Sequence, residues 1–246
     1  LYVLIPCPRL SEGLSYSTAY YDRNHRLLRL TLTGDDKYRL HLPLTQIAPV
    51  MIDATLLYED RHFYRHPGVN PVSLARAAWQ TFTDGRLIGG STLTMQLARI
   101  RFNIDTRNIS GKLMQILRAL QIELFYSKDE ILEAYLCLAP YGGNVEGVGA
   151  ASLIYFGKSA NRLTPAEALS LSVIPQSPSR RVPGHRALNE ARDLLAQKWI
   201  ATHAAGERDL LRMPLALHNI SNLPFHAPHF VDALSPAPSR SGVVIT

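Results

Sequence analysis

The sequence predicts a mainly α domain that begins with a small β hairpin. Apolar residues recur at helical spacing through most of the range 43–205, and capping signals precede several of these runs. Before them, residues 16–42 alternate apolar with charged side chains, which is the period of a half-buried strand. Helices that follow one another without intervening strands exclude the doubly wound nucleotide-binding folds.

Length and charge limit the classes of protein to consider. With 246 residues, 46% of them hydrophobic, the chain can bury one sizeable core. Its net charge of +6 indicates an anionic partner, such as phosphate, nucleic acid or an anionic membrane surface. Cys7 and Cys137 lie in unrelated surroundings and imply no disulfide framework or zinc knuckle. We expect no nucleic-acid partner, because the helices lack a helix-turn-helix pattern or an aromatic-basic surface.

Three segments are predicted along the chain. Residues 1–42 contain an apolar stub and the β segment, residues 43–205 form the main domain, and residues 206–246, rich in Pro, Ala and His, form a linker. The apolar residues 1–6 cannot cross a bilayer, which takes roughly 20 residues. They read equally as the remnant of an anchor or as a frayed start. The strand-like residues from Val243 onwards stop in the middle of the strand pattern, so we expect a fragment of a longer protein.

The β segment contains two alternating runs. Leu28, Leu30 and Leu32 form the first, and Tyr38 to Leu42 the second. The range 34–36, Gly-Asp-Asp, is typical of a hairpin loop between them.

The stretch 59–68, EDRHFYRHPG, follows a helical run that opens with Pro49 in its first turn. It contains pairs of carboxylates, imidazoles, guanidiniums and aromatic rings. A solvated helix end with a Pro-Gly turn has the same composition, whereas a functional site would place these acid–base groups at the lip of a cleft. On this stretch alone both interpretations stay open.

A second stretch, 89–96, GGSTLTMQ, opens another helix. Ser91 or Thr92 can cap it, and a Gly-Gly turn there leaves backbone N–H groups that favour an anion. Arg99, Arg101 and Arg107 add guanidiniums suited to phosphate oxygens. An ordinary capped helix with a basic flank is the alternative.

The later helices are predicted from periodicity and caps. A helix over 110–126 would bury Leu113, Ile116, Leu117, Leu120 and Leu124. Capping boxes at Ser127–Glu130 and Thr164–Glu167 open two more, Gly157 ends another, and a last amphipathic helix covers 186–204. In the helix after Pro71, Arg76 lies beside the apolar face and is either solvated or an anion contact.

Three stretches of the sequence, in this order, resemble the motifs of a known family. The stretch 59–68, residues 89–94 (GGSTLT) and residues 128–136 (KDEILEAYL) resemble the family 51 peptidoglycan glycosyltransferases, the membrane-proximal domain of class A penicillin-binding proteins. The resemblance covers roughly residues 45–183, and residues 67–71 with Met95 are similar to the 1C subgroup. It implies a lysozyme-like, bilobal, mainly α glycosyltransferase domain.

The resemblance also implies a function. Family members polymerise lipid II into β-1,4-linked glycan strands with inversion and release of undecaprenyl diphosphate. Glu59 matches the catalytic base, which takes a proton from the attacking hydroxyl. Arg76, Arg99 and Arg107 match cationic positions that would stabilise the departing diphosphate. Lipid II, the growing glycan chain, the membrane surface and other cell-wall synthesis proteins are the implied partners. The implied location is the periplasmic face of the inner membrane, behind a single-pass N-terminal anchor.

The site residues implied by the resemblance fall into two groups. The catalytic residues are Glu59 and Gln115, where Gln115 occupies the place of the family's second glutamate. The residues implied in substrate binding are Asp60, Phe63, His66, Arg76, Gly90, Ser91, Thr92, Gln96, Arg99, Arg107, Lys112, Lys128 and Glu133.

Gln115 departs from the family pattern, as do Gly111, Met114 and Met95 nearby. Mg²⁺ is the cofactor that the family implies, but a neutral amide supplies no anionic metal ligand. We therefore expect a weaker dependence on magnesium than in typical members, and a slower enzyme.

Two alternatives remain. A catalytically weak or inactive scaffold that binds lipid II would be compatible with Gln115. A lysozyme-like hydrolase would need a protonated acid beside the scissile bond and, in most families, a second carboxylate. The basic residues count against the hydrolase, since glycan cleavage releases no phosphate.

Overall fold

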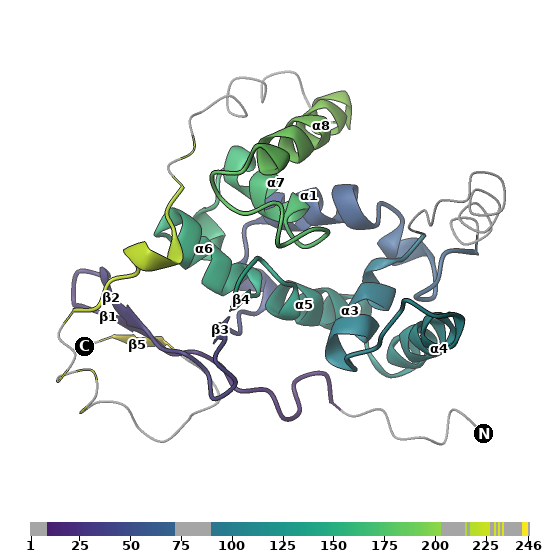
Figure 1. Ribbon diagram of the computed structural model, residues 1–246, viewed down its shortest axis with the longest axis horizontal. Helices are drawn as coiled ribbons and strands as arrows, with labels where there is room; N and C mark the ends of the chain where they lie inside the picture. The colour runs from purple at the N-terminus through teal and green to yellow at the C-terminus, as the bar shows by residue number, and fades with distance from the viewer. Residues whose placement is uncertain are drawn as a thin grey trace. The chain divides into compact units, whose positions relative to one another are not determined.

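The computed structural model describes residues 9–71, 90–202, 215, 217–226, 229, 231 and 233, and the backbone of Val243–Ile245. Within them the chain is mainly α (Figure 1). The helices are α1 (Pro49–Glu59), α3 (Leu93–Arg101), α4 (Ile109–Phe125), α5 (Lys128–Leu138), α6 (Val148–Phe156), α7 (Pro165–Val173) and α8 (Arg186–Thr202). The strands are β1 (Ala19–Tyr21), β2 (Leu27–Leu30), β3 (Tyr38–Arg39), β4 (Val145–Glu146) and β5 (Val243–Ile245).

The chain divides into two compact units. Unit 1 comprises residues 1–12 and 59–138, and unit 2 comprises residues 13–58 and 139–246. Glu59, the last residue of α1, therefore begins the main segment of unit 1. The predicted segment boundaries at 42/43 and 205/206 stay predictions.

In the described part of unit 1, the helices α3, α4 and α5 pack on one another. Helix α3 is the central one and buries Leu93 and Leu97 completely. Thr92 caps it, as predicted, by accepting a hydrogen bond from the backbone N–H of Met95 at 3.2 Å. The capping box of α5 is also confirmed, because Ser127 and Glu130 bond to each other's backbone N–H groups.

Helix α4 has the predicted extent, but its predicted buried side is wrong. Leu113 is 57% exposed and Leu124 66% exposed, and Leu117 and Leu120 are exposed as well. The buried positions of α4 are Gln115, Ala119, Gln121 and Ile122. The amide side chains can be buried because each of them is hydrogen-bonded: Gln115 to Lys112 and Met95, and Gln121 to Arg118.

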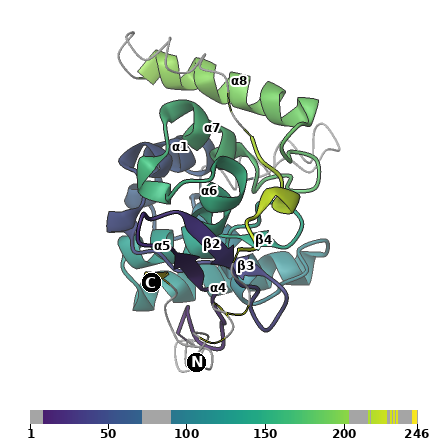
Figure 2. The same ribbon diagram turned by 90° about the vertical axis from the view of Figure 1, so that its left-hand side faces the viewer.

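Unit 2 is organised around α6, which is buried along its whole length. Gly157 ends α6 at a φ of 65°, as predicted from its position. Helix α7 opens with the predicted capping box of Thr164 and Glu167. The long helix α8 packs on α7 and lies outermost among the helices of unit 2 (Figure 2).

The predicted β hairpin between the runs 28–32 and 38–42 is wrong, because β2 and β3 belong to different sheets. β1 pairs antiparallel with β2 through the turn 22–26, whereas β3 pairs in parallel with the distant β4. The turn forms there because Asp22 accepts hydrogen bonds from the backbone N–H groups of Asn24 and Arg26. The parallel strand β5 lies on the other side of β1.

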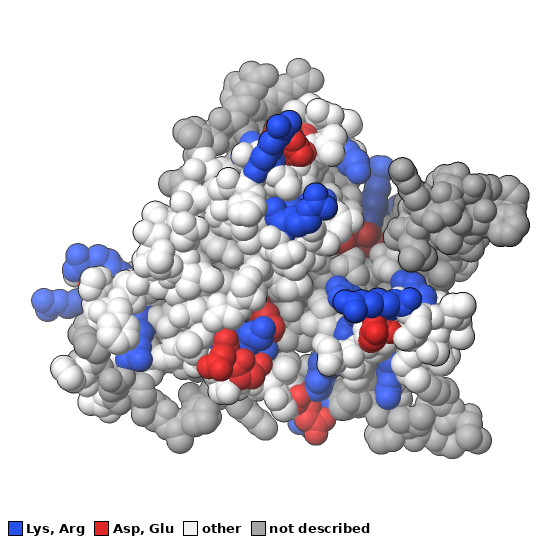
Figure 3. All heavy atoms as spheres, viewed as in Figure 1, with Lys and Arg blue, Asp and Glu red and all other residues white. Residues whose placement is uncertain are grey.

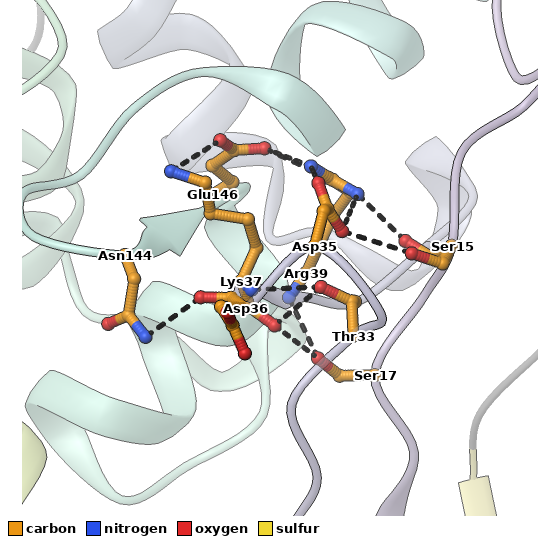
Figure 4. Close-up of polar contacts among 9 residues, drawn as sticks. All are labelled: Ser15, Ser17, Thr33, Asp35, Asp36, Lys37, Arg39, Asn144 and Glu146. Atoms are coloured by element: carbon orange, nitrogen blue, oxygen red, sulfur yellow. Dashed lines mark hydrogen bonds and ion pairs between the residues drawn. The ribbon is translucent and has the colours of Figure 1, made fainter.

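The pair β3–β4 is fixed by a buried guanidinium. Arg39 is 4% exposed and donates to Glu146 at 2.6 Å, to Asp35 at 2.9 Å and to the carbonyl of Ser15 at 2.8 Å (Figure 4). The range 34–36, predicted as a hairpin loop, therefore bends so that Asp35 meets Arg39. The hydrogen bond from Arg39 lowers the pKa of Asp35 well below its ordinary value of 3.8.

Across the described part of the chain, helices fall short of the length and apolar character that crossing a bilayer requires.

Candidate active site

Glu59 is held by a side chain of α3. It is half-buried at the end of α1, and the Nε2 of Gln96 donates a hydrogen bond to its Oε2 at 2.6 Å. The hydroxyl of Tyr135, on α5, lies 3.5 Å from the Oε1 of the same Gln96. Tyr135 is buried, at 1% exposed, and contacts the side-chain oxygen of Gln96. This contact orients the amide of Gln96 so that its N–H points towards the carboxylate of Glu59.

A second cluster joins α3 to α4 around Lys112. The Nζ of Lys112 donates to the Oγ of Ser91 at 2.8 Å and to the Oε1 of Gln115 at 2.9 Å. The Nε2 of Gln115 donates to the carbonyl of Met95 at 2.7 Å. All partners of the ammonium here are neutral, so its positive charge is not compensated within the cluster.

Arg99 adds a second cation near this cluster. Burial, and then the charge of Arg99, lower the pKa of Lys112. Gln96 and Arg99 are three residues apart on α3 and so lie on one face of the helix. The face seen in Figure 3 shows Lys and Arg side chains gathered over α3 and α4. Arg107, by contrast, is 94% exposed and lies 4.0 Å from Asp105.

Asp60 ties the loop after α1 to the start of α3. Its two carboxylate oxygens lie 3.0 and 2.9 Å from the Nε2 of His66, and one of them accepts the backbone N–H of Leu93 at 3.0 Å. The hydroxyl of Thr92 donates to the carbonyl of Gly68 in the same region. Asp60 and His66 are both buried, so they brace the segment that follows Glu59.

Lys128 also contacts the loop that follows Glu59. Its Nζ donates to the carbonyl of His66 at 2.7 Å and to Glu123 at 2.8 Å, and it lies 4.4 Å from the ring centroid of Phe63. Phe63 is 1% exposed. Glu123 also accepts from the hydroxyl of Thr94. A Cβ on Gly68 would lie 2.6 Å from Glu123, and the φ of Gly68 is 79°, so only glycine fits there.

The structure thus brings most of the predicted residues of unit 1 together. Gly90 and Ser91 lie at the start of α3, and Glu133 is half-buried on α5. Arg76 lies outside the described residues. The predicted substrate contacts of all these residues stay predictions. Sequence reasoning missed Tyr135 and Glu123, and for Glu123 the one available signal was an acid on a largely apolar helix.

This arrangement suits a proton transfer beside an anionic leaving group. A hydrogen-bonded, half-buried carboxylate can accept a proton from a hydroxyl. Arg99, one turn beyond Gln96 on α3, and Lys112, on α4, can stabilise negative charge that develops during the reaction.

Comparisons with known proteins show the family of the chain. A family model described as Transglycosylase matches residues 24–204. Penicillin-binding protein 1C of Escherichia coli K12 is 50% identical over 151 residues, which are 61% of this chain and 20% of that protein. Penicillin-binding protein 1A of Aquifex aeolicus VF5 is 33% identical over 206 residues, 81% of this chain and 28% of that protein. A crystal structure of penicillin-binding protein 1A from Haemophilus influenzae gives a TM-score of 0.46 at 19% identity, covering 90% of this chain and 24% of that one.

The chain therefore spans less than a third of the length of these relatives. The family match includes both Glu59 and the Lys112 cluster, and it covers well over half of the chain. The chain belongs to the transglycosylase family, which confirms its resemblance to the glycosyltransferase domain of penicillin-binding proteins.

Proposed function

We propose that this domain polymerises lipid II into β-1,4-linked glycan strands and releases undecaprenyl diphosphate. The observation that carries the proposal is the pairing of Glu59 with Gln96 at 2.6 Å, on the helix whose next turn presents Arg99. An acid without these cations would suit hydrolysis as well. Their combination suits a reaction whose leaving group is a diphosphate.

In the proposed step, Glu59 takes the proton of the 4-hydroxyl of one disaccharide unit. The hydroxyl oxygen forms a bond to the anomeric carbon of the growing chain. The bond from that carbon to the diphosphate oxygen breaks with inversion, and the electron pair leaves with the diphosphate. Lys112 and Arg99 receive this negative charge. Gln96 keeps the carboxylate of Glu59 aimed at the attacking hydroxyl.

The residues around Gln115 do not fit a divalent cation. Its oxygen already accepts from the ammonium of Lys112, which would repel a metal ion, and its N–H donates to a backbone carbonyl. In the described part of the chain, no three His, Cys, Asp or Glu side chains converge on a point that a metal could occupy. We propose that charge stabilisation here rests on Lys112 and the arginines, with Gln115 as the residue that positions Lys112.

Asp60, Phe63, His66 and Lys128 have a different role in this proposal from Glu59. Each is bonded to or packed on another member of unit 1, and Asp60, Phe63 and His66 are buried. Their effect on substrate would therefore pass through the position of the loop after Glu59 and the start of α3.

A membrane surface is the proposed environment. The exposed apolar stripe of α4, from Ile109 to Leu124, gives unit 1 a face suited to lipid. This stripe supports a location at a membrane surface; the periplasmic face of the inner membrane and the neighbouring cell-wall synthesis proteins are proposed from the family resemblance alone.

The test is incubation of the purified protein with labelled lipid II and detection of polymer. Glu59→Gln should lower the polymerisation rate about 100-fold or more, since a general base is lost, while Gln96 can still bond the new amide. Asp53→Asn, an exposed carboxylate on the same helix, is the matched control and should be neutral.

Two other results would favour the alternatives. If the unaltered protein bound lipid II but formed no polymer, it would be a scaffold. The presence of Gln115 in place of the family's second glutamate is the observation that favours this alternative. Cleavage of uncross-linked glycan in preference to lipid II would indicate a hydrolase.

A further inference from the structure

A cavity lies in unit 2, apart from the residues proposed for polymerisation. It has a volume of about 660 Å³ and lies between the β1–β2 hairpin and the α6 region. This is within the range of roughly 300–1,000 Å³ that is typical of small-molecule sites. Leucines and cationic side chains are among the residues that line it.

The cavity has an apolar side. Leu27, Leu40, Leu42 and Leu153 contribute aliphatic surface from β2, the β3 segment and α6. A Cβ on Gly149 would lie 2.9 Å from Leu42, so the absence of a side chain there lets α6 approach this wall closely. Burial raises the pKa of Tyr21, so the phenol that lines the cavity stays neutral and can donate a hydrogen bond.

The cavity also has a cationic side. Arg26, Lys158 and Arg162 line it, and no carboxylate is among its lining residues. Two of these cations have partners outside the lining: Arg26 pairs with Asp22 at 2.9 Å and Lys158 with Glu167 at 2.8 Å.

Arg162 is the surplus charge. Within the described residues, no ion pair involves its side chain, which is exposed at the end of the 3₁₀ turn Ala160–Arg162. The cavity therefore combines an aliphatic wall with the positive charge of Arg162, which forms no ion pair within the described residues.

We propose that this cavity binds an anionic amphiphile, with an aliphatic body against the leucines and one negative charge at Arg162. The same chemistry is found in an anionic phospholipid and in a soluble alkyl anion. The turn that holds Arg26 is stabilised by Asp22, which accepts hydrogen bonds from the backbone N–H groups of Asn24 and Arg26. The site does not depend on the proposed polymerisation, so its residues and those of the Glu59 site can be tested separately.

The experiment measures binding of monomeric probes to the whole protein by calorimetry and by methyl NMR of the leucines. The probes are dihexanoyl phosphatidylglycerol and hexyl sulfate, with dihexanoyl phosphatidylcholine and inorganic sulfate as comparisons. We expect saturable binding of the first two, with shifts at Leu27, Leu42 and Leu153. The zwitterion and the inorganic ion should bind at least about tenfold more weakly, since each lacks one half of the chemistry.

Variants identify the residue responsible. Arg162→Gln should weaken both anionic probes about tenfold through the lost charged hydrogen bond, and Asn161→Glu, at the same rim, should weaken them further. Lys198→Gln, an exposed cation of α8 that does not line the cavity, is the matched control and should change nothing.

The two anionic probes distinguish the sources. Tighter binding of dihexanoyl phosphatidylglycerol would assign the cavity to a phospholipid, and tighter binding of hexyl sulfate to a soluble anion. Equal binding of inorganic sulfate and hexyl sulfate, or an unchanged affinity in Arg162→Gln, would overturn the proposal. Glu59→Gln should bind both probes normally, so a failed polymerisation assay leaves this test intact.

Discussion

The Nζ of Lys112 lies 2.9 Å from the side-chain oxygen of Gln115, one turn further along α4. Because Gln115 is neutral, this bond positions the ammonium without cancelling its charge. A glutamate in the same place would form an ion pair with Lys112 and would face the carbonyl of Met95, which the amide now satisfies. The identity of residue 115 therefore decides how much positive charge this cluster offers to a diphosphate.

The first prediction concerns the dependence of the polymerisation rate on magnesium. Polymerisation by the unaltered protein should change less than about twofold between EDTA and excess Mg²⁺, because no anionic ligand at residue 115 needs a metal. Gln115→Glu should be about tenfold slower in EDTA, since Lys112 is then paired, and added Mg²⁺ should restore part of the rate. Gln197→Glu, on the exposed side of α8, serves as the control. Near-complete loss of turnover on chelation of the unaltered protein would show this account to be wrong.

The second prediction concerns Gln96 and the pH dependence of the rate. Gln96→Glu would place a second carboxylate 2.6 Å from that of Glu59, so that the two share one proton. The acid limb of the pH–rate profile should then move to higher pH by about one unit or more. At pH values above that limb, the rate of Gln96→Glu should approach part of the rate of the unaltered protein. A profile that falls in amplitude without moving would mean that Glu59 is not the group that titrates.

The third prediction concerns the brace between Asp60 and His66. Removing the imidazole in His66→Ala takes a hydrogen-bond partner from the buried carboxylate of Asp60 and leaves it the backbone N–H of Leu93. The free energy of unfolding should fall by about 1–3 kcal/mol, measured by denaturant titration. His62→Ala removes an exposed imidazole of the same loop and should change it little. If both variants had equal stability, the Asp60–His66 contact would carry no weight in the fold.

Helix positions and caps could be predicted from the sequence because their causes are local. Thr92, the Ser127–Glu130 box and Gly157 act on backbone groups within a few residues, so their effect is visible in the order of the chain. The partner of β3 could not be predicted, because β4 lies more than 100 residues away and Arg39 selects it through Glu146.

The buried face of α4 shows a second limit. Its leucine stripe has the spacing of a core face, and that spacing is the same whether the stripe contacts protein or lipid. The polar side of the helix became buried because Lys112 and Met95 satisfy Gln115, and Arg118 satisfies Gln121. Those contacts depend on the packing of α3 against α4, which cannot be predicted from the spacing of apolar residues along one helix.

The fourth prediction tests the exposed stripe of α4. The double variant Leu113→Ser and Leu124→Ser should lower binding to phosphatidylglycerol vesicles about tenfold, because two exposed leucines would no longer enter the interface. The thermal midpoint should hardly move, since neither side chain is buried. Leu194→Ser removes a leucine of α8 that is 62% exposed and provides the control. Equal vesicle binding by the double variant would exclude α4 as the membrane-facing element.

The fifth prediction concerns the stability of unit 2 at low pH. Arg39 lowers the pKa of Asp35 below its ordinary value of 3.8, so the folded state holds this carboxylate ionised where the unfolded chain binds a proton. The stabilisation is complete above pH 3.8 and is lost as the pH falls towards the lowered pKa. The thermal midpoint should therefore fall less steeply between about pH 4 and about pH 2 in Asp35→Asn than in the unaltered protein, and it should already be lower at neutral pH. Asp36→Asn changes the neighbouring exposed carboxylate and should keep the steep fall; parallel curves for all three proteins would remove Arg39–Asp35 as the cause.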